Sequence, residues 1–222
     1  GGLYVADPLQ NRVAYYASGS DTSTPTPIPV LNAKGVAVDS SGVLYVAVGQ
    51  PGGNFVLVFG PGNEITTYSG LSSAVSVAVD SSGGLYVADD TNNLVAYYST
   101  TDTSTPTRTY SSGLSNALGV AVDSSGGLYV ADSENNRVVY YASGSDTSTP
   151  TNSYTGVSYP FCVAVDSSGG VYVTNAVNSL VAYYAPGSST STPTSFYTGV
   201  SAPNCVAVDS SGGVYVTNAV NS

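Results

Sequence analysis

One phrase recurs along this chain at a nearly constant distance. The segment Val-Ala-Val-Asp-Ser-Ser-Gly occurs five times, and its aspartates are separated by 41 residues once and by 43 residues three times. These aspartates are Asp39, Asp80, Asp123, Asp166 and Asp209. Self-similarity at a fixed period indicates that the chain is built from copies of one supersecondary unit. The period is too long for a β-helix coil or a leucine-rich repeat, and it suits a unit of four short strands.

The third repeat shows how four strands fit into this period. Residues 77–79 and 85–88 are apolar on both faces, and an Asp-Ser-Ser-Gly-Gly turn separates them. In such a turn the aspartate accepts a backbone N–H and glycine supplies positive φ. Residues 94–98 form a third strand and residues 108–110 a short outer one. Two apolar faces mean that each sheet is packed between others. The sequence therefore predicts an all-β fold, a β-propeller of four-stranded blades.

The repeat assigns the whole of residues 1–222 to a single propeller. The blade repeats lie near 1–34, 35–75, 76–118, 119–161 and 162–204, with a partial repeat at 205–222. Three strands precede the first complete repeat, sixteen lie in four complete repeats, and two follow. The total fits neither five blades nor six. We expect six blades, with five as the alternative.

The ends of the sequence carry an expectation of their own. Gly1 stands where a native start would have Met, which indicates a processed product or a segment of a longer chain. With either blade number an apolar strand is left redundant or unpaired, and such strands seek partners. We therefore expect that these residues are a segment of a longer repetitive polypeptide, or that they form a subunit which its neighbour completes by strand addition. Repeated head-to-tail addition of this kind can make a fibre.

The best copy of the repeat spans residues 120–138. It reads Val-Ala-Val-Asp-Ser-x-Gly-x-Leu-Tyr-Val-Ala-Asp, followed by Asn-x-Arg-Val. This pattern resembles the NHL repeat family of β-propellers, along essentially the whole chain. The resemblance implies a ring that usually has six blades and serves as a binding platform or, less often, as an enzyme. The family's characteristic His is absent, and Asn93, Asn136 and Ser179 stand in its place. The fold prediction is unaffected, because that His does not form the strands.

Composition excludes several classes of function. The chain has no His, so zinc hydrolases, His-dependent lyases and Ser-His-Asp arrangements are excluded in their usual forms. Four basic residues against 14 acidic ones give a net charge of −10, which argues against nucleic-acid binding and against docking on anionic membranes. No apolar run is long enough for membrane insertion. We predict that the chain is not an enzyme.

The acidic residues fall into two groups. The five repeated aspartates occupy equivalent positions, which is typical of a turn requirement. Asp89, Asp90, Asp132 and Glu134 are irregular and lie in the turns between second and third strands of two adjacent repeats. They are the best metal candidates, because Ca²⁺ takes oxygen ligands. We favour solvated turn carboxylates and no cofactor, with calcium, as in propellers that resemble lactonases, as the alternative.

The two cysteines, Cys162 and Cys205, occupy equivalent positions just before a first strand. Gly35, Ser76 and Gly119 stand there in the other repeats, so the position requires a small side chain. We favour two small thiols that are at least partly buried. The alternative is a disulfide between neighbouring blades, which requires Cα atoms within about 7 Å.

Tyrosine pairs recur on the third strands, for example Tyr97-Tyr98 and Tyr140-Tyr141. We favour packing between blades over a sugar-stacking platform of the lectin type, because identical spacing in each blade is what packing demands. The loops rich in Ser, Thr and Pro are predicted acceptors of O-linked glycans, and the chain has no Asn-x-Ser/Thr sequon. If one repeat is specialised, it is the second, with its segments 49–54 and 61–64.

Two hypotheses of function follow. The first is a non-catalytic structural or interaction propeller, extracellular or at the cell surface, whose partner is a second copy or another protein or glycan surface. It rests on near-identical repeats, low charge and loops suited to glycans. The alternative is a ligand-binding (lectin-like) propeller or a calcium-dependent, lactonase-like enzyme. That alternative needs unlike residues converging on one face, and near-identical repeats argue against it.

Overall fold

A computed structural model describes residues 2–19, 24–50, 53–60, 62, 64–100, 102–144, 149–188 and 190–219. These residues form 21 strands and one short 3-10 turn, Pro8–Gln10. The prediction of an all-β fold is confirmed. Within the described ranges, no helix has the length and apolar character needed to cross a bilayer.

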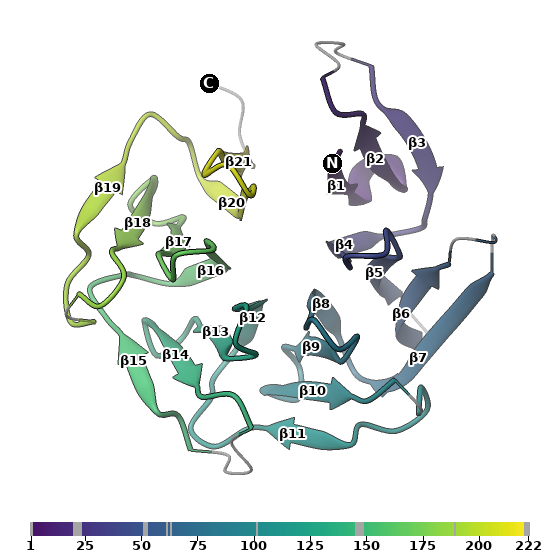
Figure 1. The fold of residues 1–222 in the computed structure, drawn as a ribbon, viewed down its shortest axis with the longest axis horizontal. Coiled ribbons are helices and arrows are strands. Elements are labelled where there is room, and N and C mark those ends of the chain that lie inside the picture. Colours follow the sequence, from purple (N-terminus) through teal and green to yellow (C-terminus); the bar gives the residue numbers. More distant parts are fainter. Residues whose placement is uncertain are drawn as a thin grey trace. The chain divides into compact units, whose positions relative to one another are not determined.

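The strands form six sheets, in each of which the strands are neighbours in chain order (Figure 1). The first sheet holds three strands: β1 (Leu3–Asp7), β2 (Arg12–Tyr16) and β3 (Thr26–Pro29). The second holds β4 (Ala33–Val38), β5 (Leu44–Gln50), β6 (Gly53–Phe59) and β7 (Ile65–Leu71). The third holds β8 (Ala74–Val79), β9 (Leu85–Asp89), β10 (Leu94–Tyr98) and β11 (Arg108–Tyr110).

The remaining sheets follow the same order. The fourth holds β12 (Ala117–Val122), β13 (Leu128–Asp132), β14 (Arg137–Tyr141) and β15 (Asn152–Tyr154). The fifth holds β16 (Pro160–Val165), β17 (Val171–Asn175), β18 (Leu180–Tyr184) and β19 (Ser195–Tyr197). The sixth holds β20 (Pro203–Val208) and β21 (Val214–Asn218). The prediction of four-stranded propeller blades is confirmed, and the number of blades in a complete ring stays a prediction.

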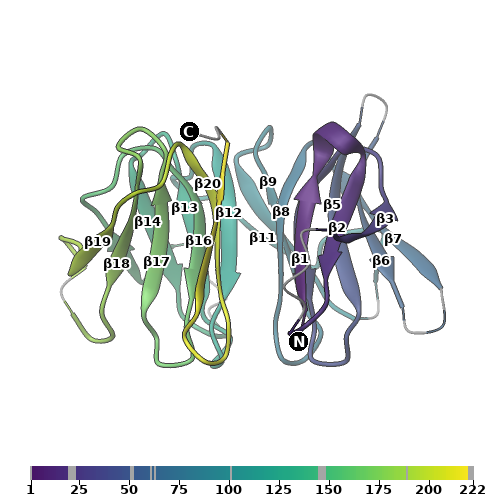
Figure 2. The same ribbon diagram turned by 90° about the horizontal axis from the view of Figure 1, so that it is seen from above.

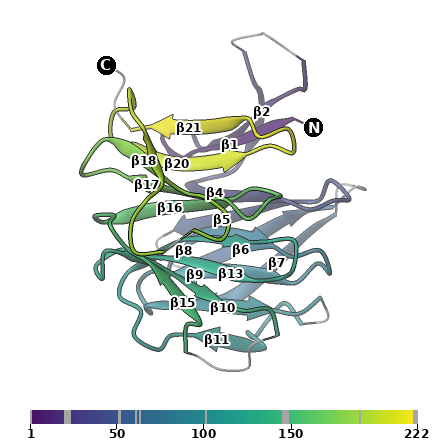
Figure 3. The ribbon, with the colours of Figure 1, turned by 60° about the vertical axis from the view of Figure 1, so that its left-hand side comes forward.

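The chain forms two compact units. The first comprises residues 1–92 and 96–108, and the second comprises residues 93–95 and 109–222. In the first unit β4 packs against β1 and β8. In the second, β16 packs between β12 and β20 (Figures 2 and 3). We call the first strand of each sheet from β4 onward its inner strand.

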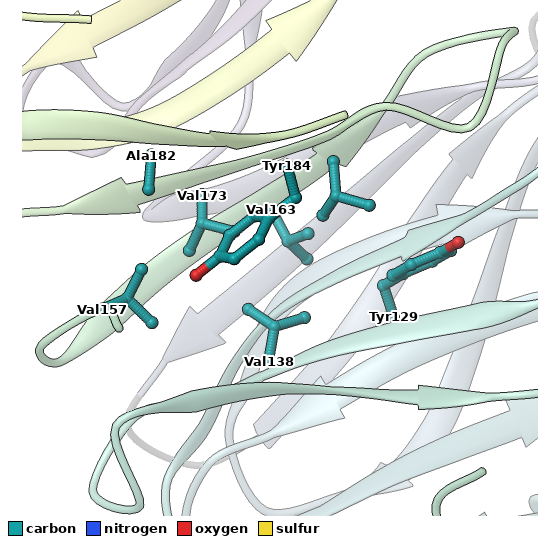
Figure 4. Packing of buried hydrophobic residues seen from close by; sticks show 8 residues of the cluster. Tyr129, Val138, Val157, Val163, Val173, Ala182 and Tyr184 are labelled. Atoms are coloured by element: carbon teal, nitrogen blue, oxygen red, sulfur yellow. The ribbon is translucent and has the colours of Figure 1, made fainter. Parts of the chain in front are cut away.

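Apolar side chains fill the space between neighbouring sheets within a unit. In the second unit, Val138 of β14 points into the same space as Val163 of β16 and Tyr184 of β18 (Figure 4). In the first unit, Val13 of β2 and Val46 of β5 are fully buried in one cluster. The strands β9, β13 and β17 are buried at every residue, so they are apolar on both faces, as the sequence indicated.

The inner strands approach one another most closely at one small residue per repeat. A Cβ atom placed on Gly119 would lie 2.7 Å from the carbonyl oxygen of Phe161 and 2.8 Å from the Cα atom of Cys162. Gly35 meets the backbone of Val75 and Ser76 at similar distances. A register shift marks this part of every inner strand. The predicted need for a small side chain therefore comes from contact between two backbones.

Candidate functional site

The five repeated aspartates build the turns between first and second strands. Oδ1 of Asp123 accepts hydrogen bonds from the backbone N–H of Ser125 at 2.9 Å, the Ser125 hydroxyl at 2.6 Å and the backbone N–H of Gly127 at 2.8 Å. The other four accept equivalent backbone bonds. The turn interpretation of these aspartates is confirmed.

Hydrogen bonds to two carboxylates predict that the fold loses stability in acid. Hydrogen bonds to Asp102, chiefly from the Ser104 backbone N–H, lower its pKa to about 2, and bonds to Asp209, chiefly from the Ser211 hydroxyl, do the same. A pKa that is lower in the folded state than the ordinary 3.8 means that the stabilisation is present above about pH 4 and is lost as the pH falls toward 2. Urea midpoints measured between pH 5 and pH 2 should therefore fall less steeply in Asp102→Asn than in Asp90→Asn. Equal slopes would show that these bonds do not stabilise the folded state.

Two of the four metal candidates lie together in the second unit. Asp132 is fully buried, and its Oδ2 accepts from Arg137 Nε at 2.7 Å, while Oδ1 accepts from the Ser115 N–H at 2.7 Å. Asn135 Nδ2 donates to both oxygens of Asp132. Glu134 Oε2 accepts from the Ser115 hydroxyl at 2.6 Å. These carboxylates therefore join their turn to the loop that precedes β12.

The other two candidates lie in the first unit, at the end of β9 and directly after it. Asp89 is buried and accepts from the N–H groups of Ser72 and Ser73 at 2.8 and 3.0 Å, and from Asn92. Asp90 accepts from the Thr91 hydroxyl at 3.3 Å. Across the described ranges no three His, Cys, Asp or Glu residues are grouped so as to hold a metal ion. Calcium at these positions stays a hypothesis, and it would have to displace the existing donors.

Asparagine side chains connect successive repeats where the NHL family has its His. Asn136 Oδ1 accepts from the Tyr159 N–H at 2.8 Å, Asn93 Oδ1 from the Asn116 N–H at 2.6 Å, and Asn11 Oδ1 from the Asn32 N–H at 3.2 Å. All three have φ between 52° and 54°. Asparagine tolerates this left-handed conformation better than most residues. The asparagine at each of these positions thus accepts a hydrogen bond from a backbone N–H farther along the chain. We call this repeated bond the asparagine clasp.

The fifth repeat lacks this clasp and offers a stabilising substitution. Ser179 has φ 51°, like the clasp asparagines, but no bond joins its side chain to Ala202 in the described structure. Ser179→Asn should add one hydrogen bond and relieve the left-handed backbone, for a gain of about 1 kcal/mol. The mirror substitution Asn136→Ser should lose a similar amount. Urea denaturation of both variants checks this, and a loss of stability in Ser179→Asn would contradict it.

The tyrosine pairs of the third strands are part of the packing. The rings of Tyr129 and Tyr140, cross-strand partners, have centroids 4.7 Å apart, and the second members Tyr98, Tyr141 and Tyr184 are buried. The ring of Tyr184 also packs against that of Tyr154 in the preceding sheet, with the ring centroids 5.1 Å apart. The packing interpretation of these pairs is confirmed.

The hydroxyls of the three buried tyrosines differ in whether they have a hydrogen-bond partner. Tyr98 Oη donates to the Ser69 carbonyl and Tyr184 Oη to the Thr155 carbonyl, each at 2.6 Å. Tyr141 Oη is buried and has no partner among the described residues. Tyr98→Phe and Tyr184→Phe should each cost about 1 kcal/mol, whereas Tyr141→Phe should be neutral or stabilising, because it removes an unsatisfied buried hydroxyl. Chemical denaturation of the three variants decides this, and equal losses would contradict it.

Cys162 and Cys205 are joined by a disulfide, with Cα atoms 5.0 Å apart. Cys162 is buried and Cys205 is exposed. The bond lies at the close approach of β16 and β20, where other repeats have glycine or serine. The prediction of two separate thiols is therefore wrong, and the alternative, a disulfide between neighbouring sheets, is present.

The loops predicted to be specialised or glycosylated are described only in part. Residues 20–23, 145–148 and 189 of the Ser/Thr/Pro loops lie outside the described residues, as do 51, 52, 61 and 63 of the second repeat. In the loop that is best described, the Asp102 carboxylate accepts from both Ser104 and Thr105 hydroxyls. The Thr103 carbonyl of that loop accepts from Ser69 N–H at the end of the preceding sheet.

Sequence reasoning missed two exposed aromatic residues in the second unit. Tyr159 and Phe161 are 38% and 37% exposed, just before and within β16. Alignment at the period of 43 would have shown the signal, because Tyr159 stands where Asn116 stands one repeat earlier. Tyr159 and Phe161 therefore differ from the residues at the same positions one repeat earlier.

Tandem four-stranded sheets with buried faces and packed inner strands define the class of protein: this is a β-propeller. Residues 114–141, which include β12, β13 and β14, match the NHL repeat. This match covers one repeat and agrees with the resemblance of the chain to the NHL-repeat β-propellers. A search of curated protein sequences finds no match.

Solved structures share the fold at low sequence identity. Nidogen in its complex with laminin has a TM-score of 0.76 at 19% identity, over 98% of this chain and 85% of that one. A catalytically inactive virginiamycin B lyase from Staphylococcus aureus with quinupristin has 0.70 at 12%, over 98% and 73%. A Bacteroides uniformis protein proposed to be a 6-phosphogluconolactonase has 0.72 at 10%, over 94% and 71%. These neighbours include enzymes and a member of a protein–protein complex, so the fold alone does not decide the function.

Proposed function

We propose that this chain is a non-catalytic, extracellular interaction propeller. One observation supports the proposal above all: the side chains best suited to acid–base or metal chemistry are already engaged in building the fold. Asp132 is bonded to Arg137 and Ser115, and Asp89 to two backbone N–H groups. A catalytic carboxylate needs free access to a substrate.

Other features favour an extracellular role in binding another macromolecule. Nidogen, a structural neighbour, was solved in complex with laminin. A chain of low charge with recurrent Ser/Thr/Pro loops suits an exposed location, where those loops would carry O-linked glycans. The disulfide between Cys162 and Cys205 suits an oxidising compartment.

The partner that we propose first is a second copy of the chain. Tyr215 on β21 is 46% exposed, whereas its equivalents Tyr86, Tyr129 and Tyr172 are 5–6% exposed beneath a third strand. Among the described residues, the sheet β20–β21 holds two strands, and β21 is its outer strand. A strand from a neighbouring subunit would bury Tyr215, and repeated head-to-tail addition of this kind would make a fibre.

Sedimentation velocity over a wide concentration range tests this proposal. The chain should associate as its concentration rises, and Tyr215→Lys should shift it to monomer, because a lysine at a strand edge opposes pairing. Phe196→Lys is the matched control, since Phe196 is equally exposed on β19 of another sheet, and it should associate like the parent chain. A parent chain that stays monomeric at every concentration would contradict self-association.

The alternative is a ligand-binding propeller or a calcium-dependent, lactonase-like enzyme. The break in the repeat at Tyr159 and Phe161 favours ligand binding, because a binding site requires repeats that differ. For the enzyme, we expect no lactone hydrolysis or lyase turnover above background, with or without added calcium. Turnover that disappears in Asp132→Asn but not in Asp7→Asn would replace the proposed function with an enzymatic one.

A further inference from the structure

Tyr159 adopts a backbone conformation that its residue type disfavours. Its φ is 48°, and the equivalent positions Asn32, Asn116 and Ala202 have φ of 50°, 57° and 45°. Asparagine is enriched in the left-handed region, whereas a bulky residue there is a genuine outlier and costs about 1 kcal/mol or more. Tyr159 is thus a bulky residue at a left-handed position where two other repeats have asparagine and one has alanine. Strain of this kind often marks a functional position.

The tyrosine ring is held at both ends and remains open to solvent. The backbone N–H of Tyr159 is bonded to Asn136 through the asparagine clasp, and Tyr159 Oη accepts from Asn116 Nδ2 at 2.7 Å. Because the hydroxyl is the acceptor in that bond, its own proton is available to a ligand. The ring is therefore a preorganised surface that loses little conformational entropy on binding.

A second aromatic ring and a second amide lie on the neighbouring inner strands. Phe161 is exposed directly before Cys162, and Asn204 is exposed directly before Cys205. The Cα atoms of the two cysteines are 5.0 Å apart, so Phe161 and Asn204 precede the point where β16 and β20 come close together. We call the set the Tyr159 patch: Asn116, Tyr159, Phe161 and Asn204.

The charge around the patch restricts the class of ligand. The second unit contains a single basic residue, Arg137, which is already paired with Asp132 at 2.7 Å. An anionic ligand, such as a phosphate or a nucleic acid, would find no free positive charge. Two aromatic faces with two amides and a phenol suit a ligand that combines apolar C–H faces with hydroxyl groups. We propose that the Tyr159 patch binds a neutral saccharide. This inference goes beyond the proposed self-association, which involves Tyr215 on a different strand.

Saturation-transfer NMR on the full chain tests the proposal, with cellotetraose, maltotetraose and N-acetylchitotetraose as probes. At least one probe should receive saturation from the parent chain, and Phe161→Leu, which installs the residue found at position 118, should weaken its affinity at least tenfold. Phe196→Ser is the control for an exposed aromatic residue elsewhere, and it should bind like the parent. The absence of transfer to all three probes would overturn the proposal.

The decisive variant is Tyr159→Asn, because a structural role and a binding role predict opposite results. It installs the repeat's own residue at a left-handed position, so the midpoint of thermal unfolding should stay equal or rise while saccharide binding is lost. A lower midpoint together with unchanged binding would make Tyr159 a packing residue and overturn the proposal. A peptide with the sequence of residues 102–107 is the last probe: binding of that Pro-containing peptide in place of every saccharide would overturn the assigned ligand class. None of these results bears on sedimentation, so the proposed function is tested separately.

Discussion

Replacing Gly127 by valine should destabilise the chain by about 3 kcal/mol, because the site has no room for a side chain. A Cβ atom at Gly127 would lie 2.5 Å from ring atoms of Tyr140 and 2.6 Å from Asp123 Oδ2. Tyr140 is the cross-strand partner of Tyr129, and its ring covers the glycine. Gly84 has the same relation to Tyr97.

In the second repeat, both members of this glycine–tyrosine pair are replaced by valine. Val43 stands where the other complete repeats have this glycine, and the tyrosine that would cover it is replaced by Val58, the cross-strand partner of Tyr45. The turn itself tolerates valine, since Val43 N–H donates to Asp39 Oδ1 at 3.0 Å. Glycine and tyrosine thus change together within one chain.

A double-mutant cycle tests this coupling. Gly127→Val with Tyr140→Val should be more stable than Gly127→Val alone, with a coupling energy of about 2 kcal/mol in urea denaturation. Gly60→Ala is the control, because a Cβ there would meet its nearest neighbour at an ordinary 3.4 Å. Additive effects of the two substitutions would show that ring and glycine are not coupled.

Arg137→Leu should cost about 2–3 kcal/mol, because it leaves the fully buried Asp132 carboxylate without its counter-charge. Asp132 pairs with Arg137 across the β13–β14 hairpin. The next repeat has Asn175 and Leu180 at the same cross-strand positions. In that repeat an amide replaces the carboxylate, whereas the third repeat, with Leu94 in place of the arginine, keeps the buried Asp89 bonded to Ser72, Ser73 and Asn92.

Residue pairs found in other repeats supply a second substitution that should restore stability and a control substitution. Asp132→Asn combined with Arg137→Leu should recover at least half of the loss, since it reproduces the Asn175–Leu180 pair. Arg12→Leu should cost less than about 1 kcal/mol, because Arg12 and Asp7 are both partly exposed. Free energies of unfolding from urea denaturation give all three values. A double variant less stable than Arg137→Leu alone would contradict the electrostatic explanation.

The repeat predicted those features that depend on local chemistry. A turn aspartate bonds to atoms two and four residues ahead, so Asp123 could be interpreted from the sequence alone. The small residue of each inner strand was predicted in the same way, because five equivalent positions varied only among Gly, Ser and Cys.

What the sequence could not predict depends on contacts between repeats. Asp89 finds its donors 16 and 17 residues earlier, at Ser73 and Ser72, and no local pattern indicates that loop. Residue type alone also conceals Tyr159, since a tyrosine gives no sign of a left-handed backbone. Its alignment with Asn116 shows a break in the repeat, but the left-handed backbone is seen only from its φ of 48° in the structure.

Calorimetric titration of calcium into the chain tests the central claim most directly, which is that its carboxylates build the fold instead of serving a site. With Asp89 and Asp132 already bonded to backbone and side-chain donors, calcium should give no saturable heat, and the thermal midpoint should be the same in calcium and in chelator. Stoichiometric binding that Asp132→Asn abolishes, together with a higher midpoint in calcium, would contradict the account.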